Sequence, residues 1–196
     1  MLKKILLLLL TLIAAFLTFV ATRPDTFHVE RSATIAAPPE VVFARIDDLH
    51  AWGDWSPWEK LDPKMTRKFD GPESGPGATY AWAGNDKVGK GRMTIQESTR
   101  PSHVGLQLEF LEPFQATSQS AFTLAPEATG TKVTWAMDGK NNFVAKVMCV
   151  FISMDKTVGG DFEKGLASLN GVAANDSARR AASAARQAAA DTARAE

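Results

Sequence analysis

Residues 104–110 read Val-Gly-Leu-Gln-Leu-Glu-Phe, the clearest alternation of apolar and polar side chains in the sequence. A period of two is typical of a strand that buries one face. Shorter or weaker strand patterns are found at residues 65–69, 78–83, 90–97, 118–124 and 131–137. Turn residues rather than helical segments separate these strands, so we expect them to form an antiparallel meander.

One more strand and two helices flank the predicted meander. Residues 26–35 alternate as a strand, and a short helix that starts at the Pro-Pro-Glu segment 38–40 is expected to follow. Apolar residues at helical spacing lie between residues 144 and 169, with a glycine pair at 159–160. We therefore expect a long C-terminal helix that has a glycine kink and packs one face on the sheet.

This order of elements, together with five motifs, resembles one known group of proteins. The motifs are ATIAAPPEVVF at 33–43, WxxWSPW at 52–58, GPGAxYxW at 75–82, GTxVxW at 130–135 and GDFxKGLxxL at 160–169. Together they are similar to the polyketide cyclase/dehydrase branch of the START-like (SRPBCC) superfamily, over about residues 28–172.

The resemblance implies an α+β helix-grip fold, in which a curved antiparallel β-sheet wraps around a long C-terminal α-helix. It also implies a cavity between the sheet and that helix. In this superfamily the cavity holds lipids, hormones, polyketides or other apolar molecules. Many branches bind or carry such molecules, and only some catalyse a reaction.

The N-terminus has the composition of a membrane-spanning helix. Residues 5–22 carry no charge, and a helix of this length spans about 27 Å, close to the hydrocarbon thickness of a bilayer. Lys3 and Lys4 precede this segment and Arg23 follows it, which predicts a cytoplasmic N-terminus and a periplasmic or extracellular domain. A cleavable signal peptide is the alternative, although residues 19–22 match its small-x-small cleavage site poorly. We expect a single-pass transmembrane helix ahead of the domain.

Three segments are therefore expected: a membrane anchor at residues 1–25, a START-like domain at 26–174 and an Ala-rich tail at 175–196. Ten of the 22 tail residues are alanine, which favours helix but buries too little surface to dock, so we expect a solvated tail. Lys+Arg and Asp+Glu both number 22, a balance that argues against a nucleic-acid partner. The single cysteine, Cys149, excludes an internal disulfide.

An apolar small molecule or lipid is the ligand expected for the predicted cavity. Large side chains and two serines are predicted to face it: Tyr80, Trp82, Met93, Phe110, Ser118, Ser120, Phe122, Trp135, Met148 and Phe151. The aromatic and methionine side chains would form an adaptable wall, and the serines would orient the ligand. The alternative is that these side chains simply fill the core.

The aromatic loop adds further candidates, namely Trp52, Asp54, Trp55 and Trp58. Its three tryptophans are consistent with a structural plug in the core, with a lid over the cavity, or with a belt at the membrane surface.

Acid–base catalysis in a cavity requires an inward acid or imidazole. Asp54 and Glu59 beside the tryptophans, and Asp155 on the final helix, are the acids to examine. The three histidines lack metal-ligand spacing, so neither a metal nor another cofactor is expected.

The sequence thus leaves three functions open, and it leaves open whether any reaction is catalysed. The first is a membrane-anchored binding module for a hydrophobic small molecule or lipid. The second is a cyclase- or dehydratase-like enzyme that uses an inward acid. The third is a non-catalytic interaction protein of the cell envelope.

Overall fold

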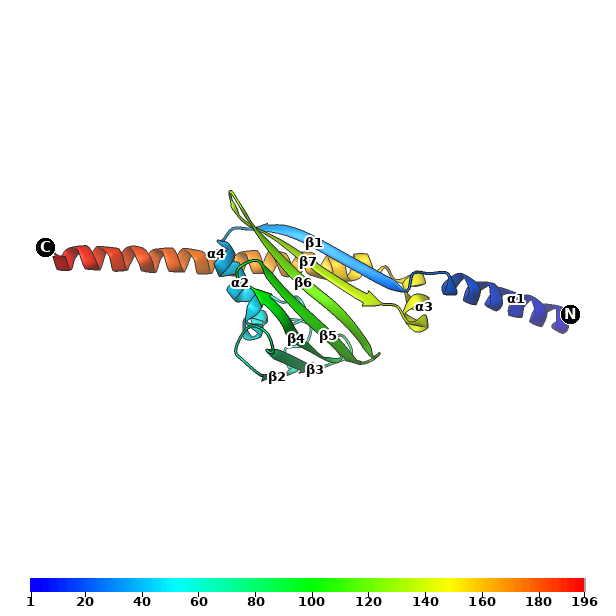
Figure 1. The fold of residues 1–196 in the computed structure, drawn as a ribbon. Coiled ribbons are helices and arrows are strands. Elements are labelled where there is room, and N and C mark those ends of the chain that lie inside the picture. Colours follow the sequence, from blue (N-terminus) through cyan, green and yellow to red (C-terminus); the bar gives the residue numbers. More distant parts are fainter. Residues whose placement is uncertain (196) are drawn as a thin grey trace.

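The computed structural model describes residues 1–195. Its elements are α1 (Leu2–Ala21), β1 (Thr26–Ile35), α2 (Pro39–Asp47), the 3-10 helix η1 (Leu49–Asp54), β2 (Thr66–Asp70), β3 (Thr79–Ala83), β4 (Lys90–Thr99), β5 (His103–Glu112), β6 (Ala116–Glu127), β7 (Gly130–Lys140), α3 (Phe143–Phe151) and α4 (Met154–Ala195). Figure 1 shows α1 and the end of α4 projecting from opposite ends of the domain.

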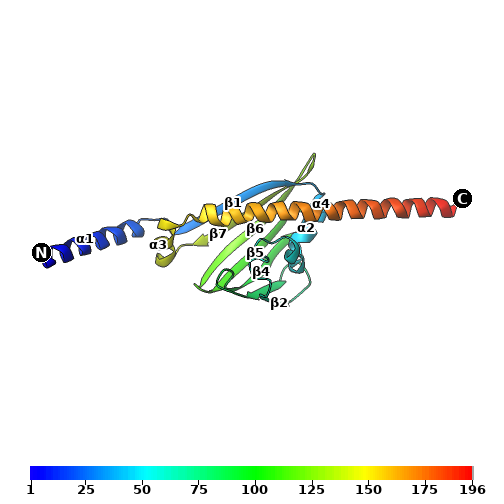
Figure 2. The same cartoon turned by 180° about the vertical axis from the view of Figure 1, so that it is seen from behind.

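The strands form one curved antiparallel sheet in the order β1-β7-β6-β5-β4-β3-β2. Strands β2 to β7 follow one another as the predicted meander, and β1 adds to its outer edge by pairing with β7 from Thr26↔Lys140 to Ile35↔Thr131. Helix α4 runs across the inner face of the sheet beside β1, and α2 and η1 lie against the same face (Figure 2). The predicted helix-grip fold is therefore confirmed.

The predicted glycine kink in the final helix is wrong. Helix α4 passes through Gly159 and Gly160 without a break, and the interruption lies earlier, at Ile152, whose backbone is extended (φ −124°, ψ 122°). Gly159 instead makes room for a neighbour, because a Cβ there would lie 2.2 Å from Nη2 of Arg31. That guanidinium donates hydrogen bonds to Asp155 at 2.9 Å and joins β1 to α4.

Gly165 on α4 also leaves space for neighbouring side chains, those of Trp135 and Pro57. We therefore expect a larger residue at this position to destabilise the fold. A Cβ at this position would lie 2.8 Å from Trp135 Cζ3 and 3.1 Å from Pro57 Cδ, whereas one at Gly171 meets nothing within 4 Å. We expect Gly165→Ala to lower the free energy of unfolding by about 1–3 kcal/mol, because it overpacks the core. Gly171→Ala is the matched control, and it should raise stability by up to about 1 kcal/mol through helix propensity. Urea unfolding followed by circular dichroism measures both, and equal effects would contradict the close packing.

The Ala-rich tail continues α4 as helix to Ala195. Near the start of the tail, Asp176 forms an ion pair with Arg45 of α2. From Ala178 to Arg194 every residue is exposed. High helix propensity without large apolar side chains accounts for a helix that does not dock.

Candidate functional site

Two tryptophans of the aromatic loop are buried by their link to α2. The indole Nε1 of Trp52 donates to the carbonyl oxygen of Ile46 at 2.9 Å, and that of Trp55 donates to the carbonyl oxygen of Arg45 at 3.0 Å. These carbonyls belong to the last turn of α2, which lacks partners within the helix. The loop therefore caps α2 and places both rings in the core, where each is nearly inaccessible to solvent.

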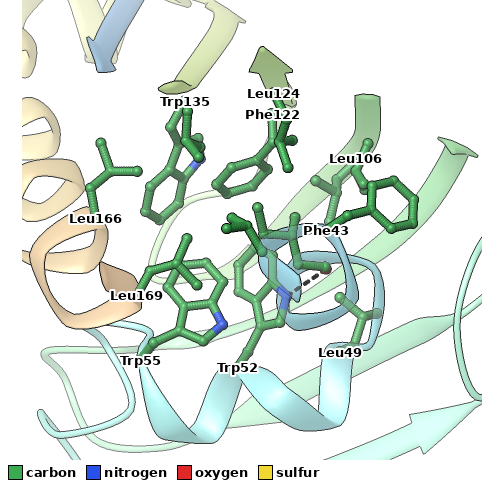
Figure 3. Packing of buried hydrophobic residues seen from close by; sticks show 14 of the residues in the cluster. Phe43, Leu49, Trp52, Trp55, Leu106, Phe122, Leu124, Trp135, Leu166 and Leu169 are labelled. Carbon is green, nitrogen blue, oxygen red and sulfur yellow. Dashed lines mark hydrogen bonds between the residues drawn. The ribbon is translucent and has the colours of Figure 1, made fainter. Parts of the chain in front are cut away.

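Trp135 of β7 is the centre of a set of stacked rings. It stacks on Phe162 of α4 at 4.1 Å between ring centroids and on Phe122 of β6 at 4.7 Å. Trp55 and Trp52 contact it edge-on at 5.6 and 6.2 Å. We call these five residues the aromatic plug, because they fill the space between the sheet and α4. Figure 3 labels Trp52, Trp55, Phe122 and Trp135 of this set.

The plug decides between the roles considered for the loop tryptophans. Trp52 and Trp55 lie inside the core, which excludes a lid or a membrane belt made of these two rings. Trp58 is half-buried and packs edge-on against Trp135 at 5.7 Å. Phe122 and Trp135, predicted to line a cavity, therefore contact other side chains of the protein in the plug.

The two candidate serines differ in what their hydroxyl groups do. Ser120 Oγ accepts a hydrogen bond from Trp135 Nε1 at 3.0 Å and donates to the carbonyl oxygen of Ala136 at 2.9 Å, so it holds the plug in place. Ser118 lies two residues nearer the start of β6, and across residues 1–195 we find no hydrogen-bond partner for its hydroxyl. Ser118 is itself buried, and its hydroxyl lies next to the ring of Phe27 above Gly139.

The inner face of the sheet is less densely covered at the end nearest to α1. Strand pairing places Phe27, Gly139, Ser118, Leu108 and Met93 in one row across five strands. The next row outward holds Phe110, Gly91 and Trp82, with the two rings 6.2 Å apart. We call the half-buried side chains in these rows the open patch: Phe27, Trp82, Leu108 and Phe110. Met93 and Tyr80, also predicted to face the ligand, are buried beside it.

Met148 and Phe151 were predicted to line the cavity, and this prediction is wrong. Both lie on α3, which is separate from the gripping helix, and both are exposed. Their helical spacing is real, but the break at Ile152 directs α3 away from the sheet and toward α1 (Figure 1).

The candidate acids have structural partners. Asp54 is exposed and pairs with Arg45 at 2.9 Å, and Asp155 is exposed and pairs with Arg31, which lowers the pKa of Asp155. Glu59 is the buried acid of the three.

Glu59 forms a small polar cluster that the sequence patterns did not reveal. Its carboxylate accepts hydrogen bonds from Tyr80 Oη at 2.5 Å and from Arg67 Nε at 2.7 Å. Burial and the hydrogen bond to Glu59 raise the pKa of Tyr80 above its usual value. The ring of Phe69 stacks on Tyr80 at 5.0 Å. These contacts fix β2, β3 and the loop after η1 relative to one another.

Two hollows open on the surface near this cluster. One, of about 540 Å³, is lined by Asp54, Glu59, Lys60 and Arg67 among others, and another, of about 360 Å³, lies around His50 and Phe69. Neither is lined by the plug or by the open patch. Within residues 1–195, His, Cys, Asp and Glu side chains nowhere gather in threes as a metal site requires.

Comparisons with known structures agree with this architecture. Protein CV1439 of Chromobacterium violaceum is 16% identical with a TM-score of 0.54, over 77% of this chain and 99% of its own. The Aha1 dimer protein of Colwellia psychrerythraea is 15% identical with a TM-score of 0.52, over 74% and 93%. Protein SA2116 of Staphylococcus aureus is 12% identical with a TM-score of 0.55, over 78% and 96%. At these identities the likeness concerns the fold alone.

Sequence comparison identifies the family. No curated protein matches the chain in sequence. The model of the family described as polyketide cyclase/dehydrase and lipid transport matches residues 26–174, which include the whole sheet, α2, α3 and the docked half of α4. The chain therefore belongs to the polyketide cyclase/dehydrase and lipid transport family of the START-like superfamily.

Proposed function

We propose that this protein is a membrane-anchored binding module for an apolar small molecule or lipid, which it holds against the open patch. The observation that carries the proposal is the contrast along the inner face of the sheet. The plug closes one half of that face, while Phe27, Trp82, Leu108 and Phe110 in the other half keep apolar surface accessible. The family description, which includes lipid transport, is consistent with such a ligand.

The chemistry of the open patch suits an acyl chain or a ring system. Three of its four side chains are aromatic, and a buried methionine, Met93, lies beside them. Flat rings and a thioether adapt to apolar ligands of differing shape. Ser118 in the same row is buried, so its hydroxyl would bond only to a polar end of the ligand that reaches down to the face of the sheet.

The expected affinity is modest. A ligand that buries about 300 Å² of apolar surface would gain roughly 7 kcal/mol, and association costs about 4 kcal/mol or more. The remainder corresponds to a dissociation constant near the millimolar range. A membrane anchor compensates for weak binding, because it holds the domain where lipids are concentrated.

The anchor in this proposal is α1. The helix is long and apolar enough to cross a membrane, and its 20 residues correspond to about 30 Å. Lys3 and Lys4 would keep the N-terminus in the cytoplasm and place the domain in the periplasm or outside the cell. Against a cleaved signal peptide stands Val20, which is fully buried near the end of α1.

A substitution in the open patch tests the proposal. We expect Phe110→Ser to reduce labelling of the β3 peptide by a membrane-borne photo-reactive lipid about tenfold, because it removes the contact area of one ring. The readout is photo-crosslinking of the full chain in lipid vesicles, which records weak binding because the lipid stays at membrane concentration. Phe114→Ser is the matched control, since Phe114 is exposed in the turn between β5 and β6, outside the inner face. Equal labelling of the β3 peptide in both variants, or no labelling of the sheet in the wild type, would refute binding at the open patch.

A further inference from the structure

Helix α3 buries its lysine and exposes its large apolar side chains, the opposite of a typical helix in a soluble protein. Its lysine, Lys146, is 8% exposed, whereas Phe151 is 76% exposed. The other exposed apolar side chains of this segment are Phe143, Val144, Met148 and Ile152. A lysine inside and a continuous apolar face outside are the reverse of what water favours.

Contacts with the segment that follows α1 explain why Lys146 is inside. Its ammonium group pairs with Asp25 at 2.5 Å. Asn141 adds a hydrogen bond from its backbone N–H to the carbonyl oxygen of Asp25 at 2.7 Å and one from its side chain to that of Pro24 at 3.2 Å. The side chain of Asn142 caps the start of α3 by accepting from the N–H of Ala145. Helix α3 is therefore held in a fixed position at the end of α1.

The contact between α3 and α1 defines how deep α3 would lie in the membrane. The ring of Phe151 lies 6.3 Å from the ring of Phe16, and Phe16 lies five residues before Ala21, the end of α1. Five residues of helix correspond to about 8 Å along the axis. Helices that lie in the membrane interface bury their apolar face by about 5–10 Å, so this depth matches.

We infer that α3 is an interfacial membrane helix, which lies in the outer leaflet with Val144, Met148 and Phe151 in the lipid and seats the domain on the bilayer. This inference rests on the proposed membrane anchoring by α1. The bilayer is the occupant of the apolar face because that face continues the exposed apolar surface of α1. The start of β1 and the end of β7 lie at the α1 end of the domain (Figure 2). With α3 in the interface, this end of the sheet, and the open patch with it, would face the membrane.

Site-directed spin labelling of the full chain in lipid vesicles tests the inference. Cys149 is replaced by serine, and single cysteines are introduced as Phe151→Cys, Leu12→Cys and Ala178→Cys. For the Phe151 position we expect more collisions with oxygen, which concentrates in lipid, than with a water-soluble nickel complex. Leu12 reports on the anchor, and Ala178 on the exposed part of α4 should be reached mainly by the nickel complex.

The labelled positions distinguish a failure of the interfacial helix from a failure of the membrane anchor. A lipid signal at Leu12 with an aqueous signal at Phe151 would overturn the interfacial helix and leave the anchor intact. An aqueous signal at Leu12 would instead overturn the membrane anchoring itself. Low collision with both reagents at Phe151, together with spin–spin broadening, would show that a second copy of the chain covers α3 and would also overturn the inference.

A charge in the apolar face gives a second measurement. Met148→Asp, with the label at Phe151, should shift that label to the aqueous pattern, because a carboxylate is costly to place in the hydrocarbon. Lys156→Asp is the control, since Lys156 is exposed on α4 and outside the apolar face. Circular dichroism verifies that the domain stays folded. An unchanged lipid pattern in Met148→Asp would contradict the placement of α3 in the membrane interface.

Discussion

Replacing Trp135 with alanine is expected to lower the free energy of unfolding by about 3–5 kcal/mol, the range for removal of a buried large aromatic ring. The ring is 2% exposed and stacks on both Phe122 and Phe162, so nothing nearby is free to fill the space it leaves. The substitution also removes the indole that donates to Ser120. Urea unfolding of the full chain in detergent, followed by circular dichroism, measures the loss.

Trp82→Ala is the control for this prediction. Trp82 is also a tryptophan on the inner face, but it is half-buried at the open patch, so its removal should cost clearly less. A loss of less than about 1 kcal/mol for Trp135→Ala would mean that the plug is loosely packed. The interior beside α4 would then have room for a ligand, and the open patch would not be the preferred site.

Arg67→Ala is expected to cost about 3 kcal/mol of stability, because it leaves the carboxylate of Glu59 buried without its cation. Glu59 is nearly inaccessible, whereas the side chain of Arg67 is 31% exposed, and this exposure sets the estimate at the low end of the usual range. The hydrogen bond from Tyr80 remains but does not supply a positive charge. Urea unfolding measures this change as well.

An exposed ion pair on the same strand provides the comparison. Lys68 pairs with Asp70 at 2.9 Å, and both side chains are exposed, so Lys68→Ala should change stability by no more than about 0.5 kcal/mol. Similar losses for Arg67→Ala and Lys68→Ala would show that the Glu59 cluster does not hold β2 and β3 in place.

Strand alternation predicted the sheet well because it depends on a local property. Successive side chains in a strand face opposite sides, so the pattern at residues 104–110 and its counterparts indicated which residues share the inner face. Alternation does not report what lies opposite that face. The distinction between the plug at Trp135 and the open patch at Phe110 depends on Trp52 and Trp55, whose positions follow from hydrogen bonds to α2 carbonyls.

The wrong predictions arose because periodicity reports only how side chains are spaced along an element, and not what they pack against. Met148 and Phe151 follow helical spacing, and such spacing reports an apolar face without distinguishing a protein core from a lipid phase. Glycines 159 and 160 suggested a break, yet the helix passes through both, and at Gly159 the missing side chain leaves space for Arg31. The Glu59 cluster joins residues from a loop and two strands, and no local pattern in the sequence links them.

We propose that a lipid or other apolar molecule lies against the half of the inner sheet face that is nearest α1. Photo-crosslinking in vesicles with a phospholipid that carries a diazirine in its acyl chain tests it most directly, with the labelled peptides of the full chain mapped by mass spectrometry. We predict labelling of the β3 and β5 peptides that contain Trp82 and Phe110, in addition to α1. Labelling confined to α1 and α3, with none on the sheet, would contradict the claim.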